Sequence, residues 1–163
     1  MTDTSEDGAA ELLALQEASF AKASATTRRS WGPEGRMTGP ELAAFLDGSR
    51  YAVVASVRPD GRPHATPVRF LRRGTTFWLP TAAGTARERA VRRSPWLSLV
   101  VSEPHRDQHT AVVVEGPVEI VAVADTPPDL HATDLTWATL WFRLDPASLL
   151  SYTNRPAGDA RST

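Results

Sequence analysis

The sequence contains no cysteine, and this absence excludes several kinds of chemistry at once. Without thiols the chain forms no disulfide, offers no thiolate metal ligand and carries no thiol nucleophile. Lysine is nearly missing as well, since Lys22 is the only one among 163 residues. The longest uncharged apolar run, residues 51–57, falls well below the roughly 18 residues of a membrane span. The first residues are acidic rather than basic, which argues against a secretory signal. We therefore expect a cytoplasmic protein without a membrane partner.

The remaining composition is that of an ordinary globular protein, with 41% apolar and 23% charged residues. A chain of this length is expected to form one domain with a sizeable core. Its net charge of −1 conceals a basic middle, because residues 50–106 carry eleven arginines against Asp60, Glu88 and Glu103, a local charge of +8. Such a segment suits an anionic small ligand or a nucleic acid. Arginines that only face solvent, or a base-composition bias of the genome, would give the same count.

Three helical features stand out in the sequence. Residues 1–8 are polar and acidic and are expected to be disordered, whereas residues 9–23 contain good helix formers. After a polar linker, Thr38-Gly39-Pro40-Glu41 matches a capping box with proline in the first turn, and Gly48 is a suitable end for the helix that begins there. A short helix is predicted over residues 85–93, where a second capping box opens it.

Strand-like segments fill most of the remaining chain. Every second residue of 51–57 falls on one face, and a strong turn signal follows over residues 58–62. Pro67 argues for an edge strand or a bulge, and Gly116-Pro117 predicts a bend inside a long strand, as barrels need at corners. The predicted strands are 51–57, 64–71, 75–80, 96–101, 110–123 and 140–144, while 147–152 is open to helix or strand.

This order of elements predicts a mainly β (α+β) fold, a small antiparallel barrel with one inserted helix rather than a doubly wound sheet. The predicted domain organisation has three parts. Residues 1–36 form an N-terminal extension with one helix, residues 37–153 form the barrel domain, and residues 154–163 form a disordered tail. The chain contains no internal repeat.

Thr81, Thr85 and Arg87 are the residues in the basic middle that most suggest chemistry. A helix start exposes unpaired backbone N–H groups and the positive end of the helix dipole, so it attracts phosphate. Two hydroxyls and a guanidinium can add hydrogen bonds to phosphate oxygens there. The alternative is that Thr85 is only an N-cap and that Arg87 is only solvated.

Other residue types give weaker signals. The histidines show no metal-ligand spacing, and His64 or His109 could act as an acid or base only as a guess. Ser98 and Ser102 lack the surroundings of a hydrolase nucleophile. Basic barrels with aromatic residues can bind single-stranded nucleic acid, but the tryptophans lie in or beside apolar runs and are more typical of core or interface packing. These tryptophans are Trp31, Trp78, Trp96, Trp137 and Trp141.

The ordered set of motifs resembles the pyridoxamine 5′-phosphate oxidase-like, FMN-binding split-barrel superfamily, including its flavin/deazaflavin oxidoreductase branch. The similarity covers about residues 38–152. The motifs that carry it are Pro59-Asp60-Gly61-Arg62-Pro63-His64, Thr66-Pro67-Val68, Thr81, Gly84-Thr85-Ala86-Arg87-Glu88-Arg89, Pro95 and Val114-Glu115-Gly116.

This resemblance implies a homodimer of six-stranded split barrels with a flavin in the cleft between the subunits. Thr66, Pro67 and Val68 would lie along the isoalloxazine ring, and Thr81, Thr85 and Arg87 would hold the ribityl phosphate. Arg87 and Arg89 match the two basic positions of the family's Lys-x-Arg-Asn signature. Ala90 stands in place of its asparagine, which removes one polar contact.

Two departures bear on the activity that the resemblance implies. True pyridoxamine phosphate oxidases grip the FMN phosphate with an arginine and a lysine where this chain has Thr66 and Leu71. Their C-terminal Arg-x-His element is also absent from residues 154–163. The resemblance therefore implies an FMN-dependent oxidoreductase acting on a small molecule other than vitamin B6. A reductase dependent on the deazaflavin coenzyme F-420, or a non-enzymatic flavin- or haem-binding protein, is the alternative.

Overall fold

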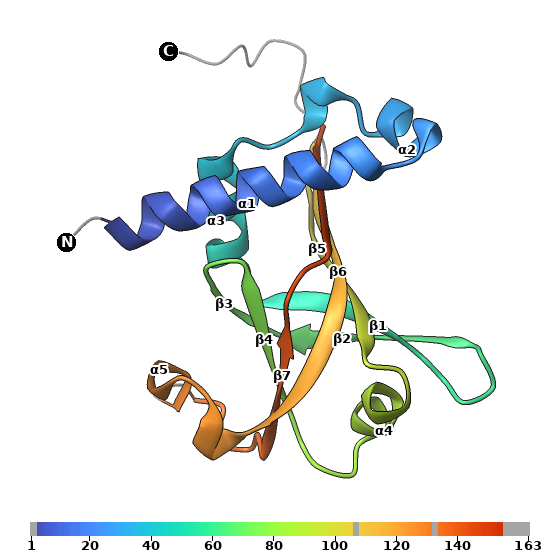
Figure 1. Ribbon diagram of the computed structural model, residues 1–163, viewed down its shortest axis with the longest axis vertical. Helices are drawn as coiled ribbons and strands as arrows, with labels where there is room; N and C mark the ends of the chain where they lie inside the picture. The colour runs from blue at the N-terminus through green and yellow to red at the C-terminus, as the bar shows by residue number, and fades with distance from the viewer. Residues whose placement is uncertain (1–2, 106–107, 132–133, 155–163) are drawn as a thin grey trace.

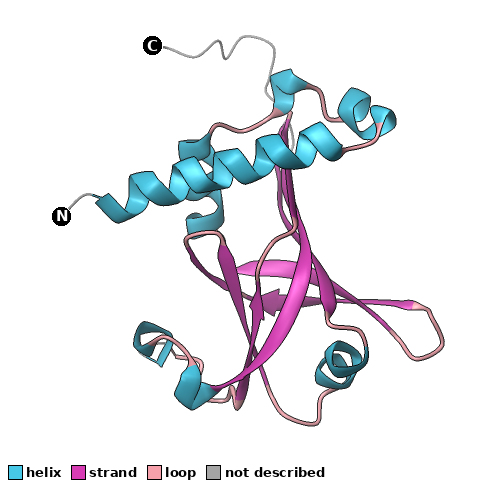
Figure 2. Cartoon of the chain, in the orientation of Figure 1, coloured by secondary structure: helices cyan, strands magenta, loops and turns pink. Residues whose placement is uncertain are grey.

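The computed structural model describes residues 3–105, 108–131 and 134–154. Its eight strands form one antiparallel sheet in the order β2-β1-β5-β6-β7-β4-β3, with β8 paired to β6 outside this path. The sheet curls into a split barrel, with α1–α3 gathered at one end and α4 and α5 at the other (Figures 1 and 2). The strands are β1 (Tyr51–Val57), β2 (Pro63–Arg69), β3 (Leu71–Arg73), β4 (Thr76–Thr81), β5 (Trp96–His105), β6 (Gln108–Ala122), β7 (Leu140–Leu144) and β8 (Ser148–Thr153).

The split barrel was predicted from the sequence, but the expected six strands are eight in the structure. The predicted strand 64–71 breaks at Phe70, whose backbone N–H donates to the carbonyl of Arg50 at 3.1 Å. Leu71 then starts the separate strand β3, which pairs with β4. The segment open to helix or strand is β8, because its backbone pairs with β6. Pro67 lies on β2, an edge strand that pairs only with β1, as predicted.

The long strand β6 joins the two parts of the sheet. Its first part pairs with β5 and β8, and its last part, Val118–Ala122, pairs with β7. The change of partner occurs at Gly116-Pro117, the bend that the sequence predicts. A Cβ atom at Gly116 would lie 2.4 Å from the carbonyl oxygen of Asp145, so only glycine allows the two segments to approach this closely.

The core lies on the inner face of the sheet, under α1 and α3. On β1 the buried residues are Ala52, Val54 and Ser56, so the alternating face that includes Tyr51 and Val53 is the outer one. Tyr51 is 63% exposed and Val53 47% exposed. A second, smaller cluster packs Leu130 and Leu135 against Trp78 and Trp141. Trp78 and Trp141 are thus buried, whereas Trp96 and Trp137 are about half exposed.

The N-terminal region is more helical than predicted. Helix α1 (Asp3–Lys22) begins within the segment expected to be disordered, and α2 (Ala25–Ser30) occupies the predicted linker, where Ser24 caps it. The other helices are η1 (Pro33–Gly35), α3 (Gly39–Gly48), α4 (Ala86–Arg93), η2 (Val123–Asp125) and α5 (Pro128–His131). The complete capping box at Thr38 confirms the predicted start of α3. Of the predicted tail, only Asn154 lies within the described residues.

A buried polar network fixes α1 on β8. Gln16 donates from Nε2 to the carbonyl of Met37 at 2.8 Å, and its Oε1 accepts from the hydroxyl of Ser151. The same hydroxyl oxygen accepts from the backbone N–H of Met37 at 3.0 Å. In addition, the backbone N–H of Leu149 donates to Ser19 Oγ at 2.9 Å.

Among the described residues, no helix combines the length and apolar content that a membrane crossing requires.

Candidate functional site

The start of α4 is built by local hydrogen bonds that the sequence signals. Thr85 is the N-cap, and its hydroxyl oxygen accepts from the backbone N–H of Glu88 at 3.1 Å. Gly84 has a φ of 78°, a conformation that glycine tolerates without strain. The carboxylate of Glu88 reaches back to the backbone N–H of Gly84 at 2.7 Å, one residue before the cap. The loop and the first turn of α4 are therefore held rigidly.

Arg87 points from this first turn toward β2. Its Nη2 donates to the hydroxyl of Thr66 at 3.2 Å. Its Nε atom is buried and has no hydrogen-bond partner within the described structure. Burial lowers the pKa of Arg87, which shows that the guanidinium has lost part of its hydration. A buried donor on a charged group is costly to leave unpaired, and an anion beside it would offset that cost.

Arg87 opens onto a pocket of about 340 Å³, which we call the Arg87 pocket. Pro67 and Val68 of β2 form its strand side, and Tyr51 of β1 lies at its edge. A segment distant in sequence closes the other side, where Arg69 Nη1 lies 2.7 Å from the Asp134 carboxylate. The lining residues are Tyr51, Pro67, Val68, Arg69, Arg87, Asp134, Leu135 and Trp137.

The residues predicted to hold a cofactor fall into three groups in the structure. Arg87 contacts Thr66 and shares a pocket with Pro67 and Val68. The buried hydroxyl of Thr81 lies 3.4 Å from that of Thr85 across the β4–α4 loop, and neither threonine lines a pocket described here. Arg89 lies elsewhere: its Nη1 donates to the carbonyl of Gly84 at 2.5 Å, and its side chain lines a second pocket.

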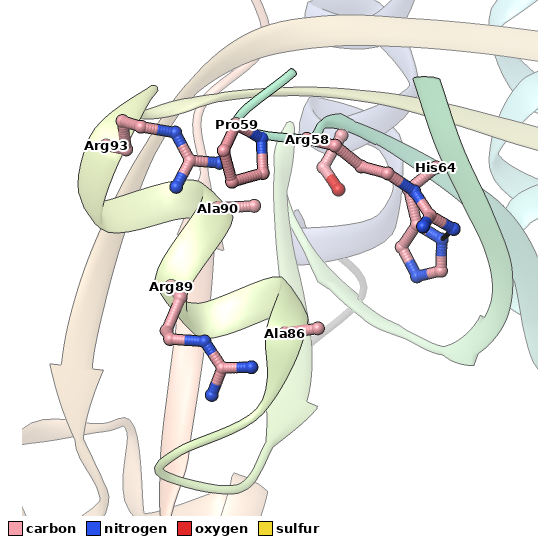
Figure 3. Close-up of a pocket in the computed structure, with 8 residues that line it drawn as sticks. Arg58, Pro59, His64, Ala86, Arg89, Ala90 and Arg93 are labelled. Atoms are coloured by element: carbon pink, nitrogen blue, oxygen red, sulfur yellow. Dashed lines mark hydrogen bonds between the residues drawn. The ribbon is translucent and has the colours of Figure 1, made fainter. Parts of the chain in front are cut away.

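This second pocket, which we call the hairpin pocket, lies between α4 and the turn that joins β1 to β2 (Figure 3). Figure 3 shows Ala86, Arg89, Ala90 and Arg93 along α4, with the hairpin residues opposite them. On the hairpin side, Arg58 Nη2 lies 3.0 Å from His64 Nδ1. Because Thr66 and His64 are alternate residues on one face of β2, the two pockets are neighbours along the same strand.

Sequence reasoning missed Tyr51, Asp134 and Trp137 as residues of the Arg87 pocket. The sequence predicts Tyr51 only as part of an alternating strand and Trp137 only as a core or interface residue. Asp134 lies 65 residues from its ion-pair partner Arg69, and nothing in the local sequence signals that contact. The 54% exposure of Trp137 is visible only in the structure. No group of three His, Asp or Glu side chains in the described part of the chain is arranged to hold a metal ion.

The Arg87 pocket combines a guanidinium that has an unpaired hydrogen-bond donor with apolar and aromatic side chains. A guanidinium with a free buried donor suits a phosphate or carboxylate. Pro67 and Trp137 offer flat apolar area to a ring system. The described lining also contains no histidine, and its one carboxylate, Asp134, is engaged by Arg69. The arrangement can therefore bind and orient a planar anionic molecule.

Comparisons with known proteins agree with this architecture. The family model described as pyridoxamine 5′-phosphate oxidase matches residues 38–149. No curated protein matches the chain. A conserved hypothetical protein from Mycobacterium tuberculosis has a similar structure, with a TM-score of 0.65 and 23% identity over 80% of this chain and 98% of that one.

Two further solved structures share the fold. The FAD binding protein from Mycobacterium smegmatis superimposes with a TM-score of 0.60 and 19% identity, covering 75% of this chain and 99% of that chain. A protein described as an F420 reductase has a TM-score of 0.53 and 20% identity, covering 65% of this chain and 93% of that one. At these identities the likeness establishes the fold.

Proposed function

Because this chain belongs to the pyridoxamine 5′-phosphate oxidase family, we propose that it is a flavin-dependent oxidoreductase that binds FMN and acts on a small molecule other than vitamin B6. One observation carries the proposal. Arg87 holds a partly desolvated guanidinium with an unpaired buried Nε beside Pro67 and Val68. That is the arrangement expected of a side chain whose usual partner is an anion.

The donor set of the Arg87 pocket fits a flavin phosphate. Arg87 would bind the phosphate through Nε and a terminal nitrogen, and the hydroxyl of Thr66 would add a neutral donor. The side chain of Pro67 and the backbone of Val68, whose side chain is buried in the core, would support the ring system together with Trp137. When bound, the flavin would supply the hydride chemistry, and the chain would supply binding, orientation and exclusion of water.

Vitamin B6 is a poor substrate candidate for this chain. Enzymes of the family that oxidise it use a C-terminal Arg-x-His element for this substrate, and residues 154–163 contain none. Those enzymes also grip the FMN phosphate with an arginine and a lysine where Thr66 and Leu71 stand here. Replacing two cations by a hydroxyl and an alkyl group leaves Arg87 to carry most of the charge on the phosphate grip. A second candidate, an F-420-dependent reductase, is favoured by the fold shared with the F420 reductase, since a deazaflavin carries a phosphate beyond a similar ring.

We also propose that the protein works as a homodimer, with the partner covering the Arg87 pocket. The outer face of β1 exposes Tyr51, Val53 and Val57, and Trp96 on β5 lies on the same side of the sheet. These four side chains are between 47% and 63% exposed, a large apolar surface for a single chain. Tyr51 belongs both to this face and to the pocket edge, so a second copy seated here would adjoin the cofactor.

The direct test is titration of the purified apo-protein with FMN, FAD, F-420 and haem, followed by absorbance and flavin fluorescence. We expect FMN to bind most tightly. Tighter binding of F-420 than of FMN would identify the deazaflavin as the cofactor. Selective binding of haem would favour the non-enzymatic alternative. Failure of all four ligands to bind would contradict the proposal.

Arg87→Gln provides the matched site variant. Loss of a charge-assisted hydrogen bond should cost about 1.5–3 kcal/mol, which corresponds to a roughly 10- to 100-fold higher Kd for FMN. Arg87→Lys should retain only part of the affinity, because a lysine keeps the positive charge but loses the paired N–H donors of the guanidinium. Arg62→Gln removes an exposed arginine outside both pockets and is the control. Unchanged FMN affinity in folded Arg87→Gln would refute the phosphate assignment.

A further inference from the structure

Three arginines of the hairpin pocket have no carboxylate partner. Among the described residues, Arg58, Arg89 and Arg93 form no ion pair. Their hydrogen-bond acceptors are neutral: a ring nitrogen of His64, the carbonyl of Gly84 and the carbonyl of Val57. Six other arginines behave differently, since each of them pairs with an aspartate or glutamate. These paired residues are Arg62, Arg69, Arg72, Arg73, Arg92 and Arg143.

The acids nearest to this pocket are already engaged. Asp60, in the hairpin turn, pairs with Arg62 at 2.7 Å. Glu88, on α4, pairs with Arg92 at 2.6 Å and takes the backbone N–H of Gly84 as well. Neither carboxylate lines the pocket. The positive charge of the three arginines is therefore concentrated in one concave place and is offset only at longer range, by Asp60 near Arg58 and by Glu88 near Arg89, which favours an anion from solution.

The pocket is shaped for more than an inorganic ion. Its volume is about 340 Å³, whereas a cavity of about 150 Å³ is already large enough for benzene. Ala86 and Ala90 present their methyl groups from α4, and Pro59 adds an apolar ring from the hairpin (Figure 3). A ligand that fits would place an apolar body against these three residues and an anionic group toward Arg58 and Arg93.

We propose that the hairpin pocket is a second binding site, for a small organic anion with an apolar body and a phosphate or carboxylate group. It is distinct from the Arg87 pocket proposed to hold the flavin, because the two pockets share no lining residue. The two sites can then be occupied together. Arg58 and Arg93 would bind the anionic group from opposite walls.

The test uses the full-length protein with three probes at low ionic strength: phenyl phosphate, benzoate and the neutral benzyl alcohol. Calorimetric titration should detect binding of at least one anionic probe and none of the alcohol, with affinity falling as salt is added. Comparison of phenyl phosphate with benzoate identifies which anionic group the site prefers. Saturation with FMN should leave the probe affinity unchanged.

Arg58→Gln is the decisive variant, because the Arg58 side chain hydrogen-bonds only to His64 among the described residues, while its backbone bonds in the turn are kept by glutamine. Arg58→Gln and Arg93→Gln should each raise the probe's Kd about tenfold. The Arg93 side chain also hydrogen-bonds to the carbonyl of Val57, so the thermal stability of the Arg93→Gln variant is measured alongside its probe affinity. Arg62→Gln and Arg87→Gln should leave probe binding unchanged.

Four results would overturn the proposal. These are absence of binding by both anionic probes, equal binding of benzyl alcohol, displacement of the probe by FMN, and unaltered affinity in both Arg58→Gln and Arg93→Gln. Tighter binding of a single-stranded oligonucleotide through the same arginines would also overturn it, in favour of a nucleic-acid surface.

Discussion

At the scale of single residues, Glu88 couples the fold of α4 to pH. Its side chain is 8% exposed and accepts hydrogen bonds from Arg92 Nε and the backbone N–H of Gly84. These two bonds lower the pKa of Glu88 below its ordinary value of 4.5. A lowered pKa in the folded state stabilises the protein above the unfolded value, and this stability is lost as the pH falls through the folded pKa.

Glu88→Gln should therefore lower the melting temperature near neutral pH, and the difference from wild type should shrink as the pH drops below 4.5. Thermal melting between neutral and acidic pH measures this. The control is Glu119→Gln, because Glu119 is 68% exposed and lies 3.8 Å from Arg143. A stability difference that stays constant with pH would show that the carboxylate charge is not the cause.

Local signals predicted part of the site at this scale. Thr85 and Arg87 could be placed because a capping box and a helix start depend on residues close together in sequence. The separation of Arg89 from Arg87 could not be foreseen, since two residues on a helix differ in direction and the packing of α4 decides which pocket each faces. Trp137 could not be assigned either, because Arg87 and the strand residues that share its pocket are fifty or more residues away.

At the scale of elements, the bend in β6 depends on one close approach. A Cβ atom at Gly116 would meet the carbonyl oxygen of Asp145 at 2.4 Å and the backbone nitrogen of Ala147 at 3.0 Å. Both neighbours are backbone atoms and cannot rotate away. Gly116→Ala should therefore destabilise the protein by about 1–3 kcal/mol and lower the melting temperature by roughly 3–10 °C.

Gly48→Ala is the matched control for Gly116→Ala, because a Cβ atom at Gly48 meets nothing within 4 Å. It should be neutral or slightly stabilising, since alanine is the better helix former at the end of α3. Thermal or denaturant unfolding of both variants measures the difference. Equal stability of the two variants would contradict the close-approach argument.

Elements with strong local patterns were predicted nearly residue by residue. Strand β1 and the start of α3 show alternation and capping that do not need tertiary information. Residues 148–153 mix serine and leucine without alternation of polarity, and β6 alone makes them a strand. The early start of α1 also depends on partners, because Gln16 and Ser19 bond to segments that follow much later.

At the scale of the whole molecule, the exposed outer face of β1 and β5 predicts a dimer. Wild-type protein should show twice the monomer mass by light scattering. Val53→Glu places a charge in the centre of the apolar face, so it should yield a monomer with weaker FMN binding. Ala14→Glu adds the same charge at an exposed position of α1 and should remain dimeric. A dimer that persists in Val53→Glu would place the interface elsewhere.

The fifteen-residue strand β6 also has a consequence for synthesis of the chain. Its first partner, β5, leaves the ribosome just before it, whereas β7 and β8 follow only at residues 140–153. Until then one long edge of β6 lacks its strand partners, and residues such as Val112 and Val114, which are buried in the folded protein, stay uncovered. Open apolar edges are prone to pair with other chains. The nascent protein is therefore most exposed to aggregation in the interval before residues 140–153, which contain β7 and β8, emerge.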